Sequence, residues 1–384
     1  MRARYRSIPL LSAALLLLAS AAVPASAAIF RVGAAGDSAC TSTTIAAALL
    51  GAAFTAEADE IRLANNQSYT SQRIATGGQS VTIRGGYANC AATVASGAGT
   101  TLDGSGGAAG PVITIDNTGG SPRPRIDLTN LTLTGGEEGG LKILGNITVV
   151  LDNCLVQFND PARGIEVRDN ASVTLRGGSL VDNNGMAGAP GIFGGGIFCD
   201  HATVDVEDAH VFNNVAFGGG GIYGTNLCRV ELARTVDVLF GNPGGVFQNV
   251  AQLGGGIYVD GGADVIAQPY LGQSIIHDNQ AARGGALYLT GTGTSGQLHD
   301  TAIDHNEASA QGGGAYVTTN ASLLMDRGTA EWLCPLGTRC SQLTRNRVTG
   351  STLGDGGGGL FVTGAATAVL RQTIVEANVF DFGS

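Results

Sequence analysis

The sequence is poor in charged and aromatic residues, and it has no long hydrophobic run after Ala19. Charged side chains make up 14% of the 384 residues and aromatic side chains 5%, with a single tryptophan. Glycines and charges interrupt every later apolar stretch, so none reaches the roughly 20 residues that a membrane-spanning helix needs. The 61 glycines follow no three-residue period, which excludes a collagen triple helix. Regularly spaced valine, isoleucine and leucine exclude a disordered chain.

The N-terminus has the features of an export signal. They follow one another in the usual order: arginines at positions 2, 4 and 6, the apolar run Ile8 to Ala19, and the small-residue cleavage site Ala25-Ser26-Ala27. We therefore expect residues 1–27 to be a signal peptide. The remainder, 28–384, is expected to be exported and to lie outside the cell or at its surface.

Removal of the three leader arginines leaves 18 basic and 31 acidic side chains, so the net charge changes from −10 to −13. So acidic a surface repels phosphate backbones and anionic lipid, which excludes nucleic acid as a partner. The glycine clusters lack the Lys-Ser/Thr of a phosphate loop, and the calcium nonapeptide of secreted β-rolls is absent. We expect no cofactor, although an acidic surface is compatible with calcium.

Two short motifs alternate along the chain. One is a glycine cluster followed by an apolar residue and, in most copies, an aromatic ring, with copies that start at Gly194, Gly219, Gly254, Gly284, Gly312 and Gly357. The other is an apolar residue followed two or three positions later by asparagine, at Asn159, Asn184, Asn214, Asn249, Asn279, Asn306, Asn346 and Asn378. The asparagines recur every 25 to 40 residues, which is typical of a solenoid.

The local patterns identify the type of solenoid. Strand-like segments such as Val204-Asp205-Val206 alternate between apolar and polar residues, so one face points into a narrow core. Asparagine tolerates a left-handed turn and bonds neighbouring backbone, so the repeated asparagines predict a ladder at one corner. The sequence therefore predicts an all-β, right-handed parallel β-helix. Its expected parts are a cap and first coils in 28–100, then repeat coils in 101–384, with no domain boundary.

A short helix is expected to cap the first coil. Thr43 to Leu50 has an apolar face formed by Ile45, Leu49 and Leu50.

Seven cysteines in an exported chain indicate disulfides. Their places favour the pairs Cys40 with Cys90, Cys199 with Cys228, and Cys334 with Cys340, although sequence alone leaves the connectivity open. Cys154 is then the odd cysteine, buried or free.

At these motifs the sequence resembles the polymorphic outer membrane protein repeat of chlamydial surface adhesins. It is equally similar to the broad class of bacterial right-handed parallel β-helix repeat proteins. The resemblance covers Val156 to Asn378. It implies the fold and an adhesion-type role, but many chemistries share this scaffold.

One segment resembles a catalytic signature. Thr235 to Asn242 is similar to the pectin methylesterase segment that carries an aspartate nucleophile, which would make Asp237 catalytic here. Arg234 replaces the leading glycine of that signature, and its Gln-Asp and Gly-Arg-Pro-Trp partners are missing. Phe240-Gly241-Asn242 is also what an asparagine corner produces unaided.

Other candidates for chemistry are weaker. Asp205 and Glu207 share one strand face. Their carboxylates fit either the acid pair of a glycosidase or a solvated acidic strand. Arg123 and Arg125 suggest a lyase base, but their spacing favours a proline-stiffened loop.

Two of the five histidines, His277 and His305, precede ladder asparagines in consecutive repeats, where they would stack. Such a row could bind a metal, although a solvent-facing corner is the simpler interpretation.

No candidate supplies a complete catalytic set. We therefore expect a non-catalytic surface or adhesion-type protein that contacts a polysaccharide or a cell-surface ligand. The alternative is a carbohydrate-active enzyme of the pectin esterase, polysaccharide lyase or glycoside hydrolase type.

Overall fold

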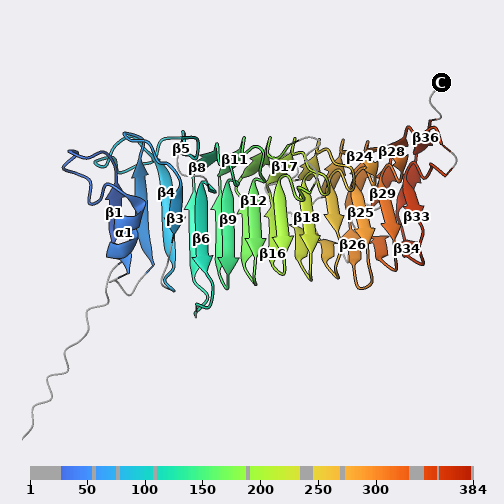
Figure 1. Ribbon diagram of the computed structural model, residues 1–384, viewed down its shortest axis with the longest axis horizontal. Coiled ribbons are helices and arrows are strands. Elements are labelled where there is room, and N and C mark those ends of the chain that lie inside the picture. Colours follow the sequence, from blue (N-terminus) through green and yellow to red (C-terminus); the bar gives the residue numbers. More distant parts are fainter. Residues whose placement is uncertain are drawn as a thin grey trace, which may run out of the picture.

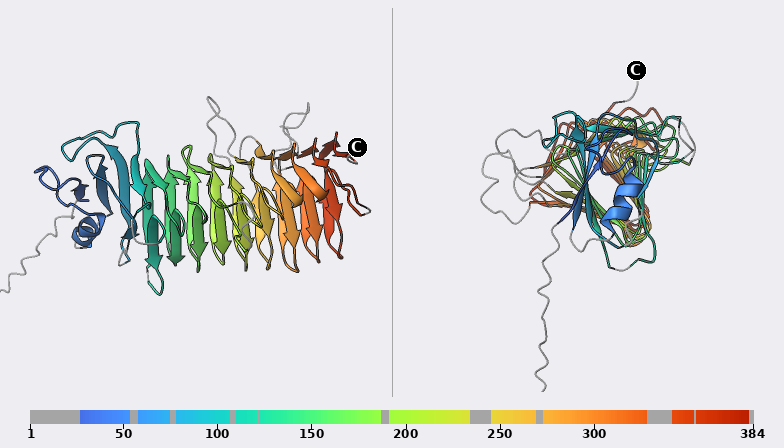
Figure 2. Two further views of the ribbon diagram at one scale, coloured as in Figure 1. Left: turned by 45° about the horizontal axis from the view of Figure 1, so that its top comes forward. Right: turned by 90° about the vertical axis from the view of Figure 1, so that its left-hand side faces the viewer.

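The protein is a right-handed parallel β-helix, as its repeats predict (Figure 1). The computed structural model describes residues 27–53, 58–74, 78–106, 110–120, 122–186, 191–233, 245–268, 273–327, 341–352 and 354–381. The coils stack along one axis, and the view down that axis shows the sheets as the walls of one tube (Figure 2). All strand pairs are parallel, which uses the backbone donors and acceptors between neighbouring coils.

Four sheets run along the axis in the part of the chain that the structure describes. Sheet A contains β1 (Ile29–Val32), β2 (Asp59–Ala64), β4 (Val81–Tyr87), β7 (Arg125–Thr129), β10 (Thr148–Asp152), β13 (Ser172–Arg176), β16 (Thr203–Glu207), β19 (Arg229–Ala233), β22 (Asp264–Ala267), β26 (Ser295–His299), β30 (Ser322–Asp326) and β34 (Thr367–Leu370). Sheet B contains β5 (Thr100–Asp103), β8 (Leu131–Thr134), β11 (Leu155–Gln157), β14 (Leu180–Asp182), β17 (His210–Phe212), β20 (Gly245–Phe247), β23 (Ser274–His277), β27 (Thr301–Asp304), β31 (Gln342–Thr344) and β35 (Ile374–Glu376).

Sheet C contains β3 (Gln72–Ile74), β6 (Ile113–Asn117), β9 (Leu141–Gly145), β12 (Ile165–Arg168), β15 (Ile197–Asp200), β18 (Ile222–Thr225), β21 (Ile257–Val259), β25 (Leu287–Thr290), β29 (Ala315–Thr318) and β33 (Leu360–Val362). The short sheet D contains β24 (Gln280–Arg283), β28 (Glu307–Gln311), β32 (Arg347–Val348) and β36 (Val379–Phe380). In the second half of the rod the chain runs from sheet B through D to C, and then to A of the next coil.

The core is a continuous column of stacked aliphatic side chains. On sheet B, for example, Val211, Val246 and Ile276 follow one another in register and are fully buried. Their neighbours along each strand point outward, because successive side chains of a strand alternate between its faces. The repeat thus fixes which residues face solvent on every coil.

The asparagine ladder is present at the corner between sheets B and D, and it starts at Asn159. Each ladder amide donates to the Oδ1 atom of the next: Asn249 Nδ2 lies 3.0 Å from Asn279 Oδ1, which also accepts from the Asn249 backbone N–H. The Asn279 Nδ2 atom in turn donates to the Val246 carbonyl of the preceding coil. Together with its bond to Asn306 Oδ1, both amide hydrogens and the amide oxygen of Asn279 are used, which is what buried polar groups require.

The left-handed turn does not fall on the ladder asparagine. It falls on the preceding residue in every copy, with φ of 54° at Gln248, 53° at Asp278 and 52° at His305. The expectation that asparagine fills both roles was wrong: one residue reverses the chain, and the next enters the core to make the ladder. The position before the ladder accepts several residue types because its side chain points outward.

The glycine clusters make close coil stacking possible. The first glycine of each cluster is left-handed, as at Gly219 with φ of 61°. A Cβ atom on the second, Gly220, would lie 2.6 Å from the Gly255 carbonyl oxygen of the next coil. These glycines are explained by packing alone.

The N-terminal end is covered by α1 (Ile45–Ala52), which lies over the first coil (Figure 2). Thr44 caps the helix and accepts a hydrogen bond from the Ala47 N–H. Leu49 is buried, as expected, but Leu50 is 68% exposed. The expectation for Leu50 was wrong because it lies one residue, about 100° around the helix, from Leu49. Ala52 takes its place in the buried face.

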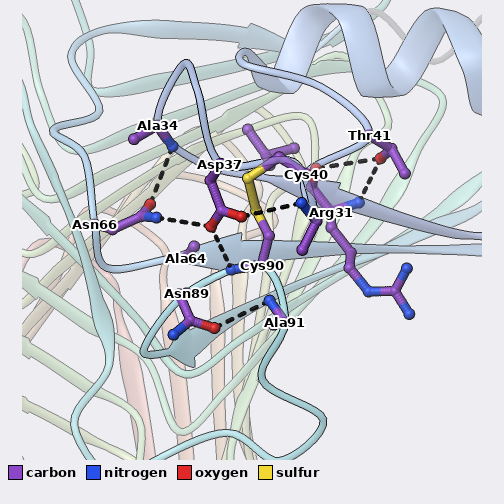
Figure 3. Close-up of a disulfide and its surroundings, with 12 residues drawn as sticks. Arg31, Ala34, Asp37, Cys40, Thr41, Ala64, Asn66, Asn89, Cys90 and Ala91 are labelled. Atoms are coloured by element: carbon purple, nitrogen blue, oxygen red, sulfur yellow. Dashed lines mark hydrogen bonds between the residues drawn. A yellow bond between two sulfur atoms is a disulfide. The ribbon is translucent and has the colours of Figure 1, made fainter.

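Two of the expected disulfides are present in the structure. Cys40–Cys90 ties the N-terminal segment to the loop after β4, and Asp37 accepts hydrogen bonds beside it from the Asn66 side chain and the Cys90 N–H (Figure 3). Cys199–Cys228 lies inside the core. Cys199 is in register with Gly224 of the next coil. Its disulfide partner is Cys228, four residues after Gly224 in the chain.

The remaining cysteines differ in their status. Cys154 is free and buried, and burial raises the pKa of its thiol to about 12, so it packs as a small apolar residue. Cys334 and Cys340 lie outside the described residues.

Candidate functional site

A shallow groove runs along the outer side of the asparagine corner. Its volume is about 530 Å³, and seven side chains line it: Asn213, Gln248, Val250, Asp278, Gln280, His305 and Glu307. These residues come from four successive coils. Because coils are spaced by about 4.8 Å, the groove extends for about 15 Å along the axis.

The groove exists because the ladder asparagine points inward while both of its neighbours point outward. The left-handed residue before the ladder, such as Asp278, forms one wall. The residue after it starts a sheet D strand and forms the other wall. There Val250, Gln280 and Glu307 align across three coils. The two rows diverge from the corner and leave a channel between them.

The groove is lined by planar polar groups. Asn213, Gln248 and Gln280 are exposed amides, and each offers both donors and acceptors. Asp278 and Glu307 add two carboxylates on successive coils. Convergent amides and carboxylates on a rigid surface are suited to hydroxyl groups, since a hydroxyl both donates and accepts hydrogen bonds.

His277 and His305 are each held by a carboxylate. His277 Nδ1 lies 2.6 Å from Asp278 Oδ2, and His305 Nδ1 lies 2.7 Å from Asp304 Oδ2. The parallel register pairs His277 with Asp304, not with His305. The expectation that the two histidines stack was wrong, because the first precedes its ladder asparagine by two positions and the second by one.

Asp304 fixes the end of the groove. It accepts two hydrogen bonds from Arg345, each of 2.9 Å, and one from the Thr344 hydroxyl of 2.7 Å. Burial alone would raise the pKa of Asp304, but the bonds from Arg345, Thr344 and His305 bring it below its ordinary value. The carboxylate is therefore ionised and holds the imidazole of His305 in place.

A stacked row of rings borders the groove on sheet B. Phe212 and Phe247 have ring centroids 5.0 Å apart with planes 11° from parallel, and Phe247 and His277 are 4.9 Å apart at 13°. His210 meets Phe247 edge-on, and burial lowers the pKa of this histidine. Since the rings cover much of one another's faces, the row mainly stiffens the wall.

The predicted acid pair lies elsewhere, on sheet A. Asp205 and Glu207 both point outward from β16, as their spacing predicts. Burial, followed by the hydrogen bond and charge of Glu207 and the charge of Glu231, raises the pKa of Asp205 to about 8. Glycosidase carboxyls stand about 5 Å or more apart, whereas these two share a hydrogen bond.

The other catalytic expectations concern Asp237 and the arginines Arg123 and Arg125. Asp237 lies outside the described residues. Arg125 begins β7 and is bonded to Asp127, while Arg123 donates to the Ser172 hydroxyl. Both arginines are thus already bonded to protein side chains at or near the start of β7.

A second, smaller cleft of about 310 Å³ is lined by Glu138, Lys142, Pro161, Ala162, Arg163, Glu166 and Ile192. Glu166 lies 3.1 Å from Arg163 and 3.8 Å from Lys142, so the charges pair with one another. Arg163 also covers the Phe198 ring. This cleft has fewer free polar groups than the groove.

Within the described ranges, one group of three potential metal ligands lies close together: Asp37, Cys40 and Cys90. The two cysteines form a disulfide and have no thiolate to offer. This group therefore does not form a metal site.

Comparison with protein-family models, with curated proteins and with solved structures gave no significant match. None of the described helices is long and apolar enough to cross a membrane. The fold and the groove define the class, a right-handed parallel β-helix with a polar channel along its asparagine corner.

The groove was not among the predicted sites, although the sequence contains a signal for it. Polar residues recur directly before and after the ladder asparagines, as in Gln248 and Asp278 on one side and Gln280 and Glu307 on the other. Which side each neighbour takes follows only from the left-handed turn.

Proposed function

We propose that this is an exported, non-catalytic β-helix protein that binds a linear polysaccharide along the asparagine-corner groove, outside the cell or at its surface. The observation that carries the proposal is the groove itself, with exposed amides and carboxylates repeated on four coils. A linear glycan presents hydroxyls at a similar repeat, so one sugar unit can lie over each coil. Solenoids commonly use such extended surfaces for binding.

Two further features support the export part of the proposal. The first 27 residues have the order of a signal peptide. Two disulfides are typical of proteins in oxidising compartments. The repeats of Val156 to Asn378 support an adhesin-like role of the polymorphic outer membrane protein type.

The test is calorimetric titration of the mature protein with neutral β-1,4-linked oligosaccharides of two to six units. Because the groove spans four coils, affinity is expected to rise by about tenfold from dimer to tetramer and to change little beyond it. No binding of any length, or binding without a length dependence, would contradict the proposal.

A matched pair of variants locates the site. Gln280→Leu removes an exposed amide from the groove, whereas Gln297→Leu removes one from the outer face of sheet A. The first is expected to lower tetramer affinity about fivefold, which corresponds to about 1 kcal/mol for lost hydrogen bonds. The second should leave it unchanged.

The alternative is a carbohydrate-active enzyme, and the raised pKa of Asp205 beside Glu207 favours it. Its test is turnover of pectins, alginate and neutral glycans with and without calcium. Release of methanol, reducing ends or unsaturated ends that is abolished by Asp205→Asn, Glu207→Ala or Asp237→Ala would establish it. Binding without turnover supports the groove proposal.

A further inference from the structure

The charges of the groove indicate which class of ligand it binds. Asp278 and Glu307 are the two ionisable acids that line it, and they sit on opposite walls of successive coils. Within the described residues, neither has an arginine or lysine at ion-pair distance. The Asp278 carboxylate contacts His277, and the Asp278 side chain is 49% exposed.

The basic residues at the next coil are already engaged. Arg345 and Arg347 continue the two walls, but Arg345 is paired with Asp304 and Arg347 with Asp381, at 2.9 Å and 2.7 Å. Among the described residues, the groove therefore has two carboxylates that no arginine or lysine pairs with, and its one lining histidine, His305, is bonded to Asp304. The net charge of −13 on the mature chain adds to the negative potential.

We propose, on the basis of the proposed polysaccharide binding, that the groove selects polysaccharide chains that bear protonated amines, as in a de-N-acetylated amino-sugar polymer. An ammonium group has three donors and no acceptor. A carboxylate supplies one acceptor for it, and the carbonyl ends of Gln248 and Gln280 supply the others. An acidic glycan would place its carboxylates against Asp278 and Glu307 and be repelled.

The experiment compares three tetrasaccharides by titration of the mature protein at low ionic strength. They are tetramers of glucosamine, of N-acetylglucosamine and of galacturonate. The glucosamine tetramer is expected to bind about tenfold tighter than its acetylated counterpart, since two exposed ion pairs contribute roughly threefold each. The preference should shrink as salt is added, and the galacturonate tetramer should bind weakest.

Two double variants test whether the preference for the glucosamine tetramer depends on the groove charges. Asp278→Asn with Glu307→Gln removes both groove charges, and the ratio between the first two tetramers is expected to fall to about one. Glu137→Gln with Asp169→Asn removes two exposed charges from other parts of the surface and should leave the ratio unchanged.

Equal binding of the two amino-sugar tetramers, or a preference that persists in the groove variant, would overturn the charge inference while leaving polysaccharide binding intact. Tetralysine serves as a peptide comparator. If it binds as tightly as the glucosamine tetramer, the groove recognises cationic chains in general and the sugar assignment is wrong. If no saccharide binds, the proposed function itself fails.

Discussion

At the scale of single residues, the ladder asparagines and their neighbours have separate tasks. Asn279 is fully buried and exchanges hydrogen bonds with the coils on either side. Asp278 and Gln280 flank it and are exposed. One residue position thus holds the coils together, and the two beside it are free to carry the ligand chemistry.

Replacing Asn279 by alanine is expected to lower the free energy of unfolding by about 2–4 kcal/mol. The change leaves the Asn249 backbone N–H and side-chain amide without their acceptor in a buried site. Denaturant titration measures the effect. Gln280→Ala, one residue along, should cost less than about 0.5 kcal/mol. An equal effect of both changes would show that the ladder is not the stabilising element.

Asp205 is expected to make stability depend on pH. Its folded-state pKa of about 8 exceeds the ordinary value of 3.8, so the folded protein holds a proton that the unfolded chain releases. Stability is then greatest below pH 4 for this group and decreases as pH rises towards 8, by about 1–2 kcal/mol after allowance for its partial exposure.

Asp205→Asn should remove that decrease. Unfolding midpoints measured at pH 5 and pH 9 test it, with Asp264→Asn on the same sheet as the control. If the wild-type protein and Asp205→Asn lose the same stability between the two pH values, the carboxyl of Asp205 is ionised in the folded state.

At the scale of elements, helix α1 closes the open end of the first coil. Ile45, Leu49 and Ala52 bury the side of the helix that packs against the first strands. The opposite side, which includes Leu50, is exposed. An open coil end would otherwise present unpaired strand edges.

Leu49→Ala is expected to cost about 2–3 kcal/mol and to raise amide hydrogen exchange in β1 and β2, because it leaves a cavity under the cap. Leu50→Ala is the control, and it should cost less than about 0.5 kcal/mol since that side chain is already in solvent. Exchange that is equally slow in both variants would show that the helix does not protect the first coil.

At the scale of the whole molecule, the rod behaves as a one-dimensional stack in which each coil contacts only its neighbours. The groove depends on this regularity, because its walls are rows assembled from several coils. A disturbance within one coil should therefore remain local.

Leu343→Ala near the C-terminal end tests this property. Leu343 is buried, and its loss is expected to cost about 2–4 kcal/mol. Hydrogen exchange should increase in β31 to β36 and stay unchanged in β1 to β10. The control is Gln342→Ala on the outward face of the same strand. A uniform increase along the rod would contradict the nearest-neighbour description.

The sequence by itself determined the repeat, the parallel β-helix and the ladder of stacked asparagines, and it favoured the pairs Cys40–Cys90 and Cys199–Cys228 that the structure contains. Periodicity and buried-polar requirements are local properties, so they can be read from spacing. It also placed Asp205 and Glu207 on one strand face, because strand alternation needs no tertiary information.

Only the tertiary structure decided where the groove lies. The direction of Asp278 and Gln280 follows from the left-handed backbone at Asp278, directly after sheet B, and the alignment of Gln280 with Glu307 follows from the stacking of positions 27 residues apart. The raised pKa of Asp205 likewise depends on its burial and on the charge of Glu231 in the next coil. A side chain's surroundings are set by register and packing, which a spacing rule does not contain.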